Sequence, residues 1–163
     1  MKPLFTLLIS FLFCAMPMSA QEVYKEVMRL SKKTADNREL SIDVRKVAQF
    51  KVDALEYMLR KTQELMPDSS VTVLDYQAFA LYDFVNLYTQ QLAKNSKKKK
   101  ERQRIMQLFQ QSSLENARFF DQDKEFIMAY VNSLQHITRF SLDTDWVIAL
   151  NDVRERLYKT KMP

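Results

Sequence analysis

The sequence predicts an all-α protein: a single compact bundle of five or six helices around a buried central helix at residues 71–92, preceded by a cleavable signal peptide. Apolar residues recur at helical spacing along most of the chain after residue 20. Glycine is absent from all 163 residues. Because glycine is the usual residue for tight hairpins, phosphate-binding loops and dinucleotide fingerprints, we do not expect these features. Helices joined by short polar loops do not need glycine.

The first 20 residues have the layout of a secretory signal peptide. Lys2 is followed by an apolar run over residues 4–15 and by the small pair Ser19-Ala20. This run is too short to cross the roughly 30 Å hydrocarbon core of a bilayer, although a retained N-terminal anchor is the alternative. We therefore expect cleavage after Ala20. The remaining residues, 21–163, form one exported helical domain, periplasmic or secreted.

The mature domain contains no thiol and is only mildly basic. Cys14 is the single cysteine, and Phe13 stands before it where bacterial lipoprotein signals have a small residue, so we do not expect lipidation. The chain has 25 basic and 20 acidic residues, a net charge of +5, and removal of Lys2 with the leader lowers this to +4. So small an excess does not indicate a nucleic-acid partner.

The first predicted helix covers residues 21–33, where apolar residues form a narrow stripe at helical period. Residues 40–44 alternate like a strand, but no partner strand is evident, so we predict an extended lead-in. A second helix is expected from Val44 to about residue 66. Pro67 ends it, because the residue before a proline is biased away from helical geometry.

Residues 71–92 are apolar on nearly every side of a helical wheel. Such a helix must be covered by its neighbours, and we expect it at the centre of the bundle. Asp75, Gln77, Asp83 and Asn86 interrupt it too often for a membrane span.

Three further helical patterns follow the polar stretch at residues 95–100. Helical spacing resumes from residue 105 to about 117, and another apolar face extends over residues 126–137. In the final helix, the apolar positions that share a face are Trp146, Leu150, Val153 and Leu157.

Two Asp-x-Asp pairs, Asp121 with Asp123 and Asp143 with Asp145, have the donor type that binds hard cations. Phe126, however, stands where a calcium loop of this spacing needs glycine. Both pairs lie where helices are expected to begin, so we interpret them as capping residues in the first turns. We predict neither a metal nor a cofactor.

No catalytic constellation is visible. His136 is the only histidine and is expected to face solvent on a helix. An enzymatic alternative rests on the scattered carboxylates Glu115, Asp121 and Asp143, whose separation the sequence does not give. We therefore predict a non-enzymatic interaction or structural module that binds another macromolecule, such as another envelope or secreted protein. The oligomeric state stays open.

The strongest local charge feature is the basic connector, defined as residues 97–104. It holds six cations and one acidic residue, enough to attract phosphates or acidic polymers. An alternative function is therefore the binding of anionic lipid or polysaccharide, whereas the plainer interpretation is a solvated loop. The candidate anion-binding residues are Lys97, Lys98, Lys99, Lys100, Arg102 and Arg104.

A second alternative function is the binding of a small apolar ligand between the helices. The residues that would line its pocket are Tyr76, Phe79, Tyr82 and Tyr88. The same spacing is typical of an ordinary core, because large aromatic rings fill the space that a ligand needs.

Overall fold

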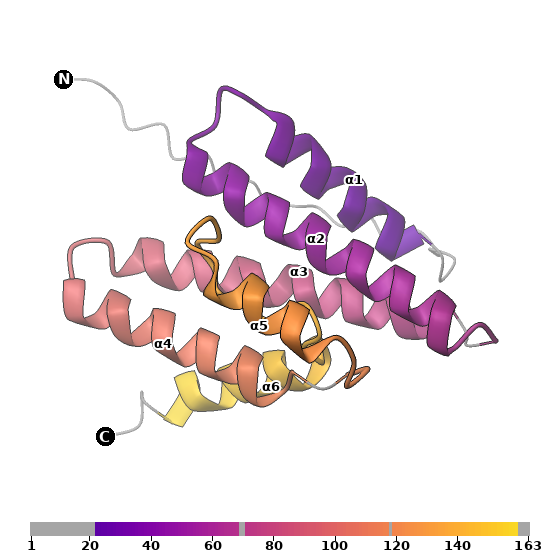
Figure 1. Cartoon of the computed structure of the whole chain (residues 1–163). Helices are drawn as coiled ribbons and strands as arrows, with labels where there is room; N and C mark the ends of the chain where they lie inside the picture. The colour runs from indigo at the N-terminus through magenta and orange to yellow at the C-terminus, as the bar shows by residue number, and fades with distance from the viewer. Residues whose placement is uncertain (1–21, 69–70, 118, 160–163) are drawn as a thin grey trace.

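A computed structural model describes residues 22–68, 71–117 and 119–159. This part of the chain is compact and all-helical, with six helices and no strand, as predicted (Figure 1). The expected signal peptide at residues 1–20 lies outside the described residues. Within those residues, no helix is both long and apolar enough to cross a membrane.

The helices follow one another along the chain in the predicted order. They are α1 (Glu22–Asp36), α2 (Ile42–Leu65), α3 (Val71–Lys94), α4 (Lys99–Glu115), α5 (Lys124–Asn132) and α6 (Trp146–Lys159).

Helix α3 is the central helix, as predicted, but it is covered on only part of its circumference. It contacts α1, α2, α4 and α6, and Figure 1 shows it behind α2, between α1 and the pair α4 and α6. Leu81 and Phe84 on its inner side are fully buried, whereas Tyr76 is 67% and Phe79 49% exposed. The expectation that neighbours surround α3 is therefore wrong for this outer side.

An aromatic cluster joins the helices around α3. The ring of Phe84 lies 5.3 Å from Trp146 of α6, 5.3 Å from Phe140 and 5.0 Å from Phe109 of α4, measured between centroids. Phe50 of α2 lies 5.8 Å from Trp146. These rings meet edge to face, the favoured geometry for aromatic pairs, and all are buried. The cluster thus connects α2, α3, α4 and α6 through one core.

Helix α2 begins earlier than the sequence pattern indicated. Ser41 is its N-cap, and the Ser41 hydroxyl accepts a hydrogen bond from the backbone N–H of Val44 at 3.5 Å. The extended lead-in predicted for residues 40–44 is therefore wrong, because this cap starts the helix at Ile42. The helix ends at Leu65, before Pro67, as expected.

The chain between α5 and α6 is a non-helical connection over residues 133–145, of which residues 140–144 are buried. The helix predicted over residues 126–137 ends at Asn132, and the connection inserts Phe140 and Leu142 into the core. Arg139 adopts a left-handed conformation with φ of 52°. This conformation usually favours glycine, which the chain lacks.

Buried hydroxyl groups join this connection to α4, and α4 to α6. The Ser113 hydroxyl accepts from the backbone N–H of Ser141 at 2.9 Å and lies 2.8 Å from the Thr144 hydroxyl. The neighbouring Ser112 hydroxyl donates to the Ala149 carbonyl at 3.1 Å. Each of these buried hydroxyl groups has a partner, as buried polar groups usually do. Among the described residues, the buried Thr138 hydroxyl of the same connection has none.

Candidate functional site

The basic connector forms part of one end of the bundle, where the chain turns from α3 into α4 (Figure 1). The turn is tight: the backbone N–H of Asn95 donates to Gln91, and that of Lys98 donates to Asn95 at 2.9 Å. The four side chains from Lys97 to Lys100 are all exposed. The helix predicted from residue 105 in fact begins at Lys99, so residues 99–104 of the basic connector are helical. The turn and the start of α4 together present four successive ammonium groups to solvent.

The two arginines of the basic connector have structural partners. Arg102 donates from its guanidinium to the Leu92 carbonyl at 3.2 Å, where a cation suits the C-terminal end of α3. Arg104 pairs with Glu101 at 3.3 Å. In the described part of the chain, none of the four lysines from Lys97 to Lys100 forms an ion pair. The six predicted residues thus divide into Arg102, which joins α4 to the end of α3, Arg104, which pairs within α4, and four exposed lysines.

The positive charge of the whole chain is concentrated here. Residues 94–104 contain seven of the 25 basic residues and one of the 20 acidic residues. The rest of the chain therefore has 18 basic and 19 acidic residues, so its charge is nearly balanced. The electrostatic field of such a cluster attracts anions before they make contact with the protein.

Two of these lysines lie where a cation is electrostatically unfavourable. Lys99 and Lys100 occupy the first turn of α4, and its N-cap, Lys98, makes no side-chain capping bond. The N-terminal end of a helix carries a partial positive charge, so cations there destabilise it. Lys100 and Arg104 are also a like-charge pair four residues apart. Glu101 is the only acidic residue in this turn.

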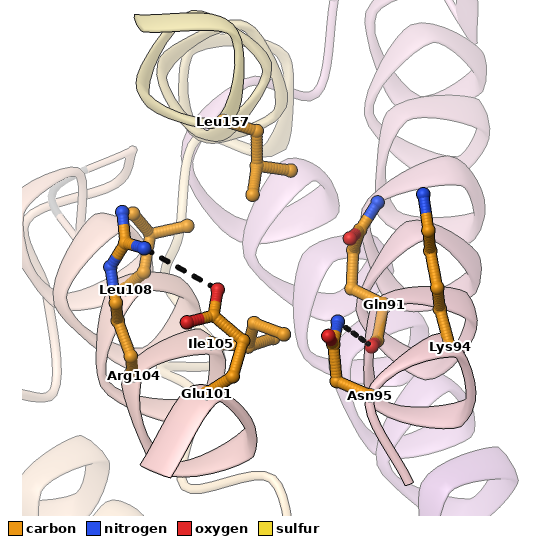
Figure 2. A pocket seen from close by; sticks show the side chains of 8 residues that line it. All are labelled: Gln91, Lys94, Asn95, Glu101, Arg104, Ile105, Leu108 and Leu157. Carbon is orange, nitrogen blue, oxygen red and sulfur yellow. Dashed lines mark hydrogen bonds and ion pairs between the residues drawn. The ribbon is translucent and has the colours of Figure 1, made fainter. Parts of the chain in front are cut away.

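Beside the basic connector is a hollow of about 170 Å³ between α3, α4 and α6. Figure 2 shows Leu157 of α6 directed into it from one side, opposite the end of α3. Ile105 and Leu108 of α4 complete its apolar wall. Ile105 is buried, whereas Leu108 and Leu157 are half-buried. The hollow thus has an apolar wall that solvent reaches in part.

The remaining lining residues are polar. Gln91, Lys94 and Asn95 come from the end of α3, and Glu101 and Arg104 come from α4 (Figure 2). The Asn95 amide donates to the Gln91 carbonyl at 2.9 Å, and Glu101 pairs with Arg104. These bonds keep amide and charged groups at the rim. Sequence periodicity places Leu157 on the apolar face of the last helix and gives no sign of this hollow.

The residues predicted to line an apolar pocket are separated in the structure. Tyr88 is buried against Phe140, with ring centroids 5.2 Å apart, whereas Tyr76 and Phe79 face outward. Tyr82 is half-buried, and the Lys51 ammonium lies 5.0 Å above its ring. Burial lowers the pKa of Lys51 to about 8. None of the four predicted residues lines the hollow beside the basic connector.

The second Asp-x-Asp pair has two different roles. Asp145 caps α6, as predicted, because its carboxylate accepts from the backbone N–H groups of Val147 and Ile148 at 3.1 Å each. Asp143 is not in the first turn. It is buried, and it accepts from the N–H groups of Phe120 and Asp121 at 3.0 and 3.1 Å. Burial raises the pKa of Asp143, and these bonds partly oppose that shift.

The other candidate carboxylates face cations. Glu115 accepts from Arg156 at 2.6 Å, and this bond is the main cause of its lowered pKa. Asp121 pairs with Lys124 at 3.2 Å. Asp123 stands at the N-cap of α5 without a side-chain capping bond and instead pairs with Lys61 at 2.8 Å.

His136 lies in a turn after α5 and not on a solvent-facing helix. Its ring stacks on Tyr130, with centroids 3.7 Å apart and an interplanar angle of 21°, and the Tyr130 hydroxyl donates to Asp53 at 2.8 Å. Burial lowers the pKa of His136; Asp53 opposes this shift and Lys46 adds to it.

In the described ranges, no three side chains of histidine, cysteine, aspartate or glutamate form a group that could hold a metal ion. Comparison with protein-family models, with curated proteins and with solved structures found no match to this chain.

Proposed function

We propose that this chain is an exported, non-enzymatic binding protein that contacts an acidic surface of another envelope or secreted protein through its basic connector. The observation that carries this proposal is the placement of the charge. Four exposed lysines, Lys97 to Lys100, stand together without a carboxylate partner in the described chain, while the rest of the sequence is nearly neutral.

A loop that only needs to be solvated does not require this arrangement. Polar uncharged residues would keep the turn soluble without placing Lys99 and Lys100 at the positive end of α4. Natural proteins tend to break local stability rules at functional sites. A bound carboxylate would relieve both the mutual repulsion of the lysines and their conflict with the helix dipole. The carboxylates considered for catalysis are instead engaged by cations or by backbone N–H groups.

Binding to labelled poly-L-glutamate, followed by fluorescence anisotropy, tests this proposal. We expect the affinity of the wild-type protein to fall steeply between about 0.02 and 0.2 M salt, because screening shortens the range of the charges. Replacing the four residues 97–100 with Gln should weaken binding about tenfold or more at low salt. The matched control makes four changes elsewhere on the surface: Lys25→Gln, Lys33→Gln, Lys46→Gln and Lys124→Gln. Equal losses in the two variants would contradict a localised site.

An anionic lipid or polysaccharide is the second candidate partner. Four consecutive exposed lysines also suit a dense anionic surface, and each lysine near an anionic bilayer contributes about 1 kcal/mol. The same two variants can be tested on phosphatidylglycerol vesicles and on polygalacturonate. If the wild-type protein binds the vesicles or the polygalacturonate more tightly than poly-L-glutamate, and only the change of residues 97–100 abolishes that tighter binding, a lipid or a polysaccharide, respectively, is the favoured partner.

Export has its own test. Intact mass measurement of protein from culture supernatant or periplasm should give the mass of residues 21–163, as cleavage after Ala20 predicts. Full-length protein confined to the cytoplasm would contradict export.

A further inference from the structure

The hollow beside the basic connector has the size of a single side chain. Its volume is about 170 Å³, and an apolar cavity of about 150 Å³ is known to accommodate benzene. A full acyl chain is much larger than this. An apolar group that entered the hollow would meet Ile105 and Leu108 of α4 and Leu157 of α6 (Figure 2).

The positive charges around the hollow favour a ligand whose apolar group is flanked by acidic groups. Lys94 and Arg104 line the hollow, and the exposed lysines of the basic connector lie in the turn between them. Glu101 also lines the hollow and pairs with Arg104, so Lys94 gives the lining its net positive charge. The amide groups of Gln91 and Asn95 offer polar atoms to a peptide backbone at the rim (Figure 2).

We propose that this hollow takes one apolar side chain, of leucine or phenylalanine size, from an acidic segment of the partner protein. The inference rests on the proposed function and names the kind of segment that binds. Carboxylates of the segment contact the lysines, and the apolar side chain inserts against Leu157. Binding interfaces commonly have such a central apolar anchor surrounded by polar contacts.

Two peptides test the inference on the purified protein: Glu-Glu-Glu-Leu-Glu-Glu-Glu and the same peptide with Ala in place of Leu. The leucine peptide should bind about tenfold more tightly, because leucine buries three more carbon atoms than alanine in a partly open site. Gln91→Phe places a ring in the hollow from α3 and should bring the ratio of the two affinities, leucine peptide over alanine peptide, close to one. Loss of the Gln91 amide from the rim should weaken binding of both peptides equally, so the ratio of the two affinities reports on the hollow alone.

A second variant, Leu157→Ala, removes part of the apolar wall and should also lower the ratio. Circular dichroism checks that both variants remain helical, so that loss of the ratio reports on the hollow. Changing residues 97–100 to Gln should weaken the binding of both peptides equally and leave the ratio of their affinities at about tenfold.

Failure of the inference can be distinguished from failure of the proposed function. A ratio near one in the wild-type protein, with both peptides still bound in a manner that depends on residues 97–100, overturns the anchor but supports the basic connector as the contact site. Absence of binding by either peptide overturns both. If Gln91→Phe weakens binding to phosphatidylglycerol vesicles and leaves the peptide ratio unchanged, the hollow takes a lipid group and the inference is wrong.

Discussion

Removing two lysines from the basic connector should make the protein more stable. The double variant Lys99→Gln/Lys100→Gln takes two cations out of the first turn of α4. Each cation at the positive end of a helix costs about 0.3–1 kcal/mol at low ionic strength. The variant also removes the like-charge pair between Lys100 and Arg104, which costs about 0.2–0.5 kcal/mol. Glutamine and lysine have similar helix propensities, so the backbone contribution is nearly unchanged.

The expected gain in the free energy of unfolding is therefore about 1–2 kcal/mol. Lys97 and Lys98 are left in place because they lie between the two helices, outside the helical residues of both α3 and α4. For a domain of this size, each kcal/mol raises Tm by about 3–4 °C. The gain should shrink at about 1 M salt, where the Debye length is about 3 Å.

Urea unfolding followed by circular dichroism, at low and high salt, measures this effect. The same variant should bind poly-L-glutamate more weakly than the wild-type protein, so that stability and affinity change in opposite directions. An unchanged or lowered urea midpoint at low salt would refute the claim that these two lysines destabilise α4.

Three further predictions concern groups away from the basic connector. Gln77→Leu should cost about 1–3 kcal/mol in urea unfolding, because the buried Gln77 amide oxygen accepts from the backbone N–H of Trp146 at 2.7 Å. Asp143→Ala should cost a similar amount and speed hydrogen exchange at residues 120 and 121, whose N–H groups it holds; unchanged exchange would contradict this role. Because the pKa of His136 is lowered on folding, the unfolded state binds more protons as pH falls through about 6.5. Stability should therefore decrease over that range, and His136→Gln should flatten the dependence.

The sequence predicted the helices where one periodic pattern dominates. The apolar face of α6 and the stop at Pro67 are such cases, because local spacing and one proline determine them. The pattern misled over residues 126–137, where Leu134 and Ile137 continue the helical spacing. In the structure, Leu134 is 87% exposed, and the core is filled instead by residues from the connection that follows α5. Tertiary packing determined where α5 ends, and local periodicity does not report such packing.

The candidate site likewise combines one feature that local sequence predicts with one that only tertiary packing creates. The run of lysines between two helices is visible in the sequence, and its position at an end of the bundle follows from the short turn. The hollow beside it is different, because it forms where Leu157 of α6 meets the end of α3 and the first three turns of α4. Leu157 lies more than fifty residues from the basic connector in the sequence. No local pattern can indicate such a meeting.

The most direct test of the central claim is NMR mapping of the binding surface. Amide shifts of ¹⁵N-labelled protein should be recorded during titration with poly-L-glutamate. We predict that the largest changes fall on residues 94–104 and that they disappear when residues 97–100 are changed to Gln. Changes centred on the exposed side of α3 around Tyr76 and Phe79, or spread evenly over the surface, would contradict the account.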